Sequence, residues 1–407
     1  MPKRSLSLIL LLLLATVAIA ACGSEATVTD TSSTPTATAT GEPFKIGFNE
    51  GFTGFMSANA QLIEHGILTA MAEVNNEWLG RPLEYVKADN ASDPVQAVDK
   101  ARLQVEKDGI QVMIGPEFSP AAQAITQYLS TVGGIPQISV FGQPVDNLKT
   151  AHGLAFMPEG IYGAETYMLG KYCVEKLGLK TANSICYEDT ASRALQAGFV
   201  EGFTEAGGTM LSENFVPPDV IDFAPYVGSL KQADCTVIWI FGNGVAPFVK
   251  QYRDYGVQAK LITLTASGNI SEPVMKDLGE AVEGIVGIDT CSPEYDSPPN
   301  KAFVDAYVAQ WDGEYPTADS YGGYIATKLF LAAVEKTGGD TTPATLIKAL
   351  SSVTLDGPSG TVSFTPYEDA YIGTTNLFIV ESKAISGDRI AWVPIQTVEQ
   401  VKLTPRD

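Results

Sequence analysis

Histidine is scarce in this 407-residue chain, and its cysteines lack metal-binding spacing. Only His65 and His152 are present, and the five cysteines contain no C-x-x-C pair, whereas a zinc site needs a cluster of such ligands. Neither G-x-S-x-G nor G-x-x-x-x-G-K occurs, so the usual signatures of a serine hydrolase and a phosphate-binding loop are missing. We therefore predict no metal, no cofactor and no enzymatic activity.

Positive charge is also in short supply. The chain has 26 Lys and Arg against 47 Asp and Glu, for a net charge of −21. No basic patch is visible, and such patches are the electrostatic footprint of proteins that bind nucleic acid or anionic lipid. Neither is expected as a partner.

The N-terminus carries the pattern of an export signal. Lys3 and Arg4 precede an apolar run that ends at Ala21 and is too short to span a bilayer comfortably. The run closes with Ile-Ala-Ala before Cys22, which resembles the lipobox of bacterial lipoproteins. We expect a signal peptide at 1–21, lipidation of Cys22 and an extracytoplasmic, membrane-anchored protein. The alternative is an ordinary secretory signal with an incidental cysteine.

A polar segment separates this signal from the folded part. Residues 22–43 are mostly Ser, Thr, Ala and acidic residues, which cannot bury enough apolar surface to offset the entropy of ordering. They are expected to form a flexible tether with a reach of roughly 25 Å. The chain from Phe44 onward is longer than one hydrophobic core usually supports, so two lobes are expected.

Short apolar runs alternate with helical periodicity through most of this region. Repeated βα units predict parallel sheets with helices on both faces. The expected strands are 44–49, 83–88, 111–114, 135–140, 184–187, 236–241, 260–265 and 284–288. Asp93 before Pro94 predicts the start of a helix.

After Cys291 the alternation ends. Helices are expected at 301–311, 321–337 and 343–350, followed by strands at 361–364, 376–381 and 392–398. A chain that returns to its first lobe predicts α/β architecture with two doubly wound parallel-sheet lobes, joined by a multi-strand hinge with a ligand cleft between them. We assign 44–157 plus 291–362 to the N-terminal lobe and 158–290 plus 363–407 to the C-terminal lobe. The protein is expected to be a monomer.

The loop Gly115–Pro120 is the most informative candidate site. In open parallel sheets, ligands bind beyond the carboxyl ends of the strands. Ser119 before Pro120 is an N-cap pattern, and the free N–H groups of the helix behind it attract anions. The alternative is that Ser119 only caps the helix and does not contact a ligand. Gln143 follows the neighbouring strand and could place its amide beside the same ligand.

Aromatic side chains also cluster at the ends of the expected strands. Phe52, Phe118, Phe141 and Phe241 could wall a pocket or belong to the lobe cores. In the second lobe, Asn243 lies between two glycines and is either a ligand contact or a turn residue. Cysteines 173, 186, 235 and 291 either form a disulfide or remain buried thiols.

Three segments resemble the type I periplasmic binding proteins of the branched-chain amino acid group. They are FKIGFNEGFTG, YVKADNASDPVQAVDKARLQVEKDGIQVMIGPEFS and IPQISV, and the likeness extends from Phe44 to about Trp392. It implies that Ser119 binds a ligand carboxylate and that Glu117 contributes backbone.

The resemblance also implies departures from the usual site. In relatives, the corresponding loop contributes backbone groups and a threonine to the ligand site, and here Phe141 and Gln143 occupy those places. Thr265 replaces the glutamate that pairs with an α-ammonium group, and Ser192 or a neighbour replaces a tyrosine. An ordinary aliphatic amino acid is therefore in doubt, unless Glu50, Glu117, Glu188 or Asp189 supplies the missing charge.

These expectations converge on capture rather than catalysis. We expect an extracytoplasmic solute-binding lipoprotein of an ABC transporter, which closes around an amino acid or a related small carboxylate or amide and delivers it to a permease. The alternative is a lipoprotein of the same fold that reports its ligand to a signalling receptor.

Overall fold

The computed structural model describes residues 41–218, 220–387 and 389–405. The expected signal peptide, the lipidation site Cys22 and nearly all of the tether lie outside these ranges. Within them, no helix combines the length and apolarity needed to cross a bilayer.

The first lobe is built on a parallel sheet. Its strands are ordered β3-β1-β4-β5-β6, and β2 pairs antiparallel with β3 at one edge. The strands are β1 (Phe44–Glu50), β2 (Glu77–Trp78), β3 (Arg81–Asp89), β4 (Val112–Ile114), β5 (Gln137–Ile138) and β6 (Ala155–Met157). The lobe's helices are α1 (Ser57–Glu73), α2 (Pro94–Leu103), α3 (Ser119–Thr131), α9 (Pro298–Gln310), α10 (Ala318–Lys336) and α11 (Pro343–Leu350).

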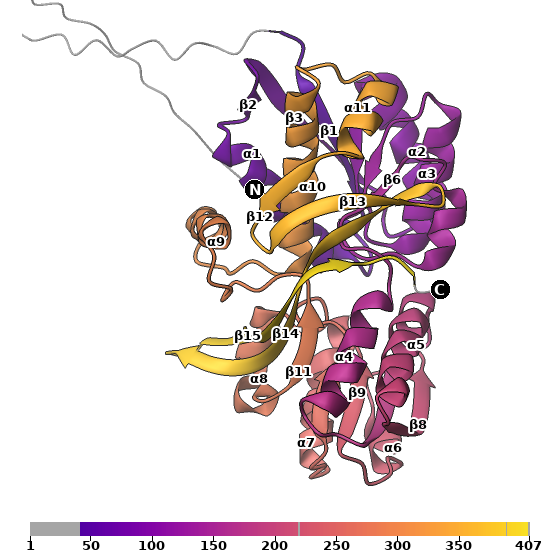
Figure 1. Cartoon of the computed structure of the whole chain (residues 1–407), viewed down its shortest axis with the longest axis vertical. Coiled ribbons are helices and arrows are strands. Elements are labelled where there is room, and N and C mark those ends of the chain that lie inside the picture. Colours follow the sequence, from indigo (N-terminus) through magenta and orange to yellow (C-terminus); the bar gives the residue numbers. More distant parts are fainter. Residues whose placement is uncertain (1–40, 219, 388, 406–407) are drawn as a thin grey trace, which may run out of the picture. The chain divides into compact units, whose positions relative to one another are not determined.

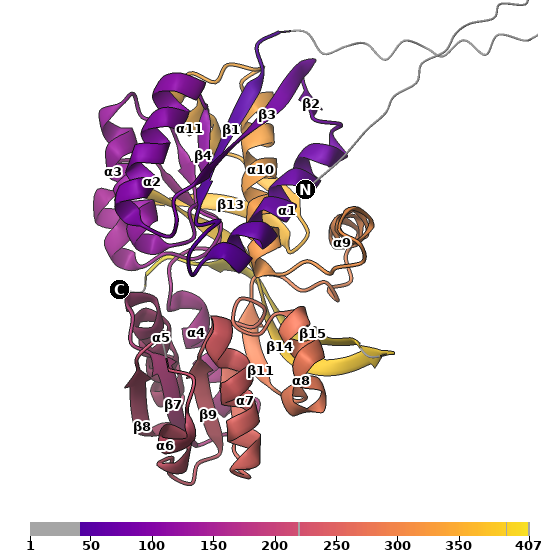
Figure 2. The ribbon, with the colours of Figure 1, turned by 180° about the vertical axis from the view of Figure 1, so that it is seen from behind.

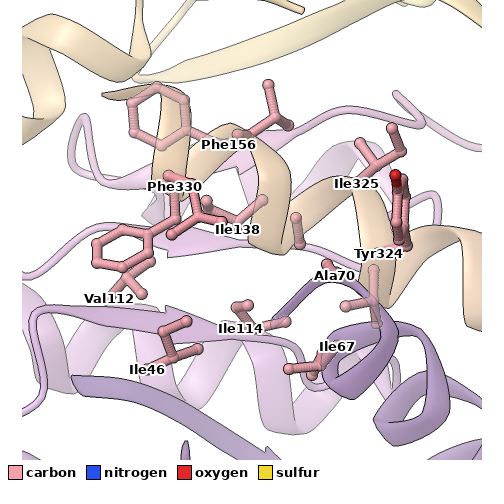
Figure 3. Packing of buried hydrophobic residues seen from close by; sticks show 14 of the residues in the cluster. Ile46, Ile67, Ala70, Val112, Ile114, Ile138, Phe156, Tyr324, Ile325 and Phe330 are labelled. Atoms are coloured by element: carbon pink, nitrogen blue, oxygen red, sulfur yellow. The ribbon is translucent and has the colours of Figure 1, made fainter. Parts of the chain in front are cut away.

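Helices cover both faces of this sheet. Side chains alternate across β4, so Val112 and Ile114 enter the core with α1 and α10, while Met113 enters the core with α2 and α3. This alternation follows from the two-residue period of a strand. Figure 3 shows Ile46, Ile114 and Phe330 packed in the larger of these cores.

The second lobe repeats the arrangement. Its sheet has the order β11-β10-β9-β7-β8, with strands β7 (Thr181–Tyr187), β8 (Thr209–Val216), β9 (Cys235–Trp239), β10 (Lys260–Thr263) and β11 (Val286–Asp289). The helices are α4 (Ala164–Glu175), α5 (Thr190–Glu205), α6 (Ala224–Gly228), α7 (Val245–Asp254) and α8 (Glu272–Leu278). Val237 and Ile238 of β9 enter different cores, one on each face. Two doubly wound α/β sheets were expected, and this fold class is confirmed.

One long strand connects the two sheets. The first residues of β14 (Ala370–Ser386) pair parallel with β6, and residues 378–381 pair antiparallel with β11. Two more strands, β13 (Gly360–Tyr367) and β15 (Arg389–Lys402), pair antiparallel with β14, and β12 (Thr354–Gly357) pairs with β13. The yellow ribbon of β14 can be followed from one sheet to the other in Figure 1.

The starts of two helices test the capping predictions. The Asp93 carboxylate accepts a hydrogen bond from the Gln96 N–H at 2.8 Å, so the predicted N-cap of α2 is confirmed. The Ser119 prediction is wrong, because α3 begins one residue earlier. Phe118 is the N-cap, and its carbonyl accepts from Ala121 and Ala122 without any side-chain cap.

Small residues bring α1 against α10. A Cβ added at Gly66 would lie 1.8 Å from the Ser320 carbonyl oxygen, and one at Gly323 would lie 2.2 Å from that of Ile63. Only glycine allows backbones to approach this closely. The two helices lie side by side in Figures 1 and 2, and this packing places the first turn of α10 beside the start of α1.

The cysteines resolve an alternative that the sequence left open. Cys173, Cys186, Cys235 and Cys291 are all buried and free. They are core thiols, and burial raises the pKa of Cys186 and Cys235.

Candidate functional site

Buried carboxyl groups converge where the two lobes meet. They come from five separate parts of the chain: the end of β1, the loop after β4, the segment that runs from β6 into the first turn of α4, the end of β11 and the first turn of α10. The six residues are Glu50, Glu117, Glu159, Glu165, Asp289 and Asp319. We call this set the acidic cluster.

A small cavity of about 20 Å³ lies beside the acidic cluster. It has room for about one water molecule, so a solute can enter only if the lining segments move. Both lobes contribute to the lining. The residues are Phe141, Gly142, Glu159, Tyr162, Glu165, Thr265, Ile288, Asp289 and Thr290.

Two glutamates present unpaired oxygens at this cavity. Glu159 is 6% exposed, and its Oε1 has no hydrogen-bond partner among the described residues. Burial raises the pKa of its carboxyl well above the usual range, and Asp289 raises it further. Glu165 lies in the first turn of α4 with its Oε2 buried and unpaired, and burial raises its pKa to about 7.

Asp289 is held by the loop after β10. Its Oδ2 accepts from the Ser267 N–H at 2.7 Å and from the Ser267 hydroxyl at 2.6 Å, and its Oδ1 accepts from the Thr290 N–H. Burial nevertheless raises its pKa. The same Ser267 oxygen accepts from the Ala318 N–H at the start of α10, so this network connects the second lobe to the first.

Glu50 and Asp319 brace the first-lobe side. Glu50 accepts from the N–H groups of Gly51 and Glu117 at 2.9 and 2.6 Å, yet burial raises its pKa to about 7. Asp319 accepts from the Asn59 amide at 3.2 Å, and burial raises its pKa to about 7 as well.

Glu117 completes the acidic cluster. Its Oε2 is buried and has no hydrogen-bond partner among the described residues. Burial raises the pKa of the Glu117 carboxyl, and the nearby charges of Asp319, Glu50 and Glu159 raise it further.

The acidic cluster has no counter-charge of its own. In the described part of the chain, no Lys or Arg forms an ion pair with any of its six carboxyls. Nor does any described group of three or more His, Cys, Asp or Glu side chains have an arrangement that could hold a metal ion. The cluster is therefore negative or protonated, depending on pH.

Three residues predicted from the sequence lie at this site. Phe141 and Thr265 line the cavity, and the Thr265 hydroxyl is buried without a partner. Glu117 belongs to the acidic cluster with its side chain; the resemblance implied a backbone role for it, and its carboxylate and that of Glu50, also in the cluster, were named as possible sources of the missing charge.

The other predicted residues lie elsewhere. Phe52 packs edge-on against Phe48 under Lys87, and Phe118 packs against the exposed Phe55. Asn243 is exposed in the short 3-10 turn Gly242–Gly244.

Ser119, Gln143 and Ser192 have local surroundings of their own. The Gln143 amide donates to the Glu117 carbonyl at 3.4 Å and accepts from Asn147, so it braces the loop. Ser192 is buried, and its N–H and hydroxyl both donate hydrogen bonds to the Asp189 carboxylate. Ser119 is half-buried at the start of α3.

The sequence reasoning missed Glu159, Tyr162, Glu165, Asp289 and Asp319. The first three follow β6, which is only three residues long, and no strand was predicted there. Asp289 directly follows the strand predicted at 284–288 and is the last residue of β11, so the rule that ligands lie beyond strand ends could have selected it.

The sequence also matches a known family. Residues 43–387 match the family model described as periplasmic binding protein. The chain belongs to the periplasmic binding protein family. The type I, branched-chain amino acid-like character that the sequence segments suggested is confirmed.

Individual relatives of this periplasmic binding protein are distant. It is 27% identical over 350 residues to the Leu/Ile/Val-binding protein homolog 6 of Brucella melitensis, covering 84% of this chain and 88% of that protein. Among solved structures, a solute-binding protein of Rhodopseudomonas palustris in complex with 3,4-dihydroxybenzoic acid is similar with a TM-score of 0.80, at 23% identity over 88% of this chain and 98% of that one.

A leucine-binding protein of Thermotoga maritima is also similar, with a TM-score of 0.76 at 20% identity, covering 88% of this chain and 99% of that one. Structural similarity at these identities establishes the two-lobe fold.

Proposed function

We propose that this protein is the extracytoplasmic, lipid-anchored solute-binding component of an ABC transporter. It captures a small nitrogen-bearing solute, such as an amino acid, an amino acid derivative or an amide, and presents it to a permease. The observation that supports this most directly is a cavity with unpaired polar groups whose lining comes from both lobes. The family consists of binding proteins, which supports a function without catalysis.

Capture proceeds by opening and closing of the lobes. We retain 44–157 plus 291–362 and 158–290 plus 363–407 as the moving bodies, with β14 among the strands that connect them. Parting the lobes separates Phe141 from Thr265 and admits the solute. The solute shifts the equilibrium toward closure only by its greater affinity for the closed form.

The solute contacts divide between the lobes. Phe141 and Thr265 contact it directly, and Ser119 and Glu117 contribute from the first lobe. Thr265 offers a hydroxyl in place of a charge, and Glu159 and Glu165 provide the negative groups that the sequence pattern appeared to lack.

A thermal-shift screen of the purified protein tests this function. A solute that binds only the native state raises the midpoint of unfolding by mass action. The panel contains amino acids, amides, aromatic acids and sugars, and small-angle scattering with each hit measures compaction. We expect at least one nitrogen-bearing compound to raise the midpoint and reduce the radius of gyration.

Two variants locate the site of that hit. Thr265→Val keeps the shape of the side chain but removes its unpaired hydroxyl, and we expect affinity to fall about tenfold. Ser119→Ala tests the first-lobe contact in the same way. Unchanged affinity in both variants would show that the solute binds elsewhere. A screen in which no compound raises the midpoint or compacts the protein would contradict the solute-binding function.

A further inference from the structure

We propose that the solute of this protein is a small organic cation. Its ammonium or amidinium group is held by Glu159 and Glu165, and its apolar part lies against Phe141 and Tyr162. The inference rests on the proposed solute-binding function and adds the charge class of the solute.

The first reason is the uncompensated charge at the cavity. Glu159, Glu165 and Asp289 all line it, and none of them is ion-paired within the described ranges. A buried carboxylate is costly to keep ionised unless it is paired. A ligand cation supplies the missing partner, and pairing in a site that excludes water is stronger than pairing at the surface.

The second reason is the pair of unsatisfied atoms that face the same cavity. Glu159 and Thr265 are each 6% exposed, and neither Glu159 Oε1 nor Thr265 Oγ1 has a hydrogen-bond partner among the residues that the structure describes. Buried polar atoms in native proteins are nearly always paired. A carboxylate accepts only, and a hydroxyl also accepts, so a ligand N–H group satisfies both atoms.

The third reason is the aromatic lining. The rings of Phe141 and Tyr162 lie 6.3 Å apart at an angle of 54°, and both line the cavity. Aromatic faces attract organic cations, most strongly where water is excluded. The described carboxyls are not arranged to hold a metal ion.

These groups also disfavour a solute whose only charge is negative. A carboxylate, such as the dihydroxybenzoate bound by the Rhodopseudomonas palustris protein, would lie beside Glu159 and Asp289 with no cation to offset the repulsion. Like charges that are close together in a site of low dielectric constant repel strongly.

Binding a cation releases protons. Burial raises the pKa of Glu165 to about 7, so this carboxyl carries a proton for part of the time near neutral pH, and burial raises the pKa of Glu159 well above its usual range, which also favours its protonated form. The carboxyls that interact with Glu159 are those of Asp289, Asp319, Glu165 and Glu117, and Glu50 interacts with Glu117 and Asp319. A cation favours the ionised carboxylates, and its affinity therefore rises by about tenfold from pH 6 to pH 8.

The test compares solutes that share a skeleton and differ in charge. One set is benzylamine, benzamide and benzoate, and the other is isopentylamine, leucinamide, leucine and isovalerate. Titration calorimetry with the purified protein at pH 8 measures each affinity, and repetition at pH 6 measures the proton linkage. We expect benzylamine to bind at least about tenfold more tightly than benzoate, and isopentylamine at least about tenfold more tightly than isovalerate. Both amines should bind more tightly at pH 8 than at pH 6.

Matched variants connect the result to the cavity. Glu159→Gln removes one charge and keeps the shape, so we expect cation affinity to fall about tenfold or more. Glu165→Gln provides the same test on α4. Glu335→Gln removes one charge from an exposed position of α10 and leaves affinity unchanged. Circular dichroism confirms that each variant is folded.

The outcomes separate this proposal from the function on which it rests. Tighter binding of leucine, benzoate or a neutral amide than of the matching cation overturns the cation and leaves the solute-binding function standing. Equal affinity of Glu159→Gln and Glu335→Gln for the cation also overturns it. If no compound of either set binds, the proposal of a cationic solute is wrong. If the thermal-shift screen also shows no shift, the solute-binding function is wrong as well.

Discussion

Two groups of acidic side chains in this protein face opposite situations. Glu272 and Glu294 contact Arg389, which donates to them at 2.6–2.9 Å while its guanidinium lies 3.2 Å from the centre of the Tyr315 ring. In the part of the chain that the structure describes, no such cation contacts the acidic cluster beside the cavity. Burial raises the pKa of Glu272, but Arg389 lowers it again, whereas in the acidic cluster neighbouring carboxyls raise the pKa of Glu159 and Glu117 further.

The difference separates an architectural charge network from a binding site. Where the chain supplies both signs, the network joins α8 to the start of β15 and is complete without a ligand. In the acidic cluster the chain supplies only negative charge, and the folded protein has an electrostatic cost that a cationic solute can relieve. Stability sacrificed at one place in a fold is a common mark of function.

The largest expected effect comes from breaking the complete network. Arg389→Met leaves Glu272 and Glu294 without their cation, and we expect the free energy of unfolding to fall by about 2–3 kcal/mol, somewhat less than for a fully buried pair. Urea unfolding at pH 7 measures it. Lys301→Met is the control, because its ion pair with Asp305 is exposed and contributes under about 0.5 kcal/mol. Equal effects in the two variants would contradict the distinction.

The second prediction concerns the pH dependence of the acidic cluster. Glu50, Glu165 and Asp319 have folded-state pKa values of about 7, above the values of the unfolded chain. The folded state therefore binds more protons, and stability falls as pH rises toward and through 7. We expect a loss of about 1.3 kcal/mol between pH 6 and pH 8 for each of these carboxyls, measured by urea unfolding without solute. A profile that rises over this interval would show that these carboxyls are compensated.

The smallest expected effect is an increase in stability, opposite in sign to the effect of breaking the Arg389 network. Glu159→Gln removes a buried charge that repels Asp289, so we expect the free energy of unfolding at pH 8 to rise by about 1 kcal/mol. The gain shrinks as the pH falls, because the raised pKa of Glu159 favours the protonated, uncharged carboxyl. Glu335→Gln changes stability by less than about 0.5 kcal/mol at either pH. Destabilisation by Glu159→Gln would mean that this carboxylate has a partner within the fold.

Sequence reasoning succeeded where the signal is local. The runs at Phe44, Leu83 and Thr236 became central strands, and Pro343–Leu350 became α11 with the predicted bounds. Hydrophobic periodicity and a proline near a helix start depend on adjacent residues, and they can be read without knowledge of the fold.

Sequence reasoning recovered less of the site because the site is assembled from distant segments. Phe141 and Thr265 were selected as residues at strand ends, and both line the cavity. Glu159 and Glu165 follow a strand too short to give a periodic signal. Asp319 depends on the close packing of α1 on α10, and sequence spacing does not reveal that contact.

By itself, the sequence determined the α/β class, the two doubly wound sheets and the family, because these follow from local periodicity and from residue patterns that run along the chain. Only the tertiary structure decided which acids are buried together and that no lysine or arginine of the described ranges pairs with them. The energy of a charge depends on burial and on its neighbours in space, and for the acidic cluster those neighbours come from five separate segments of the chain.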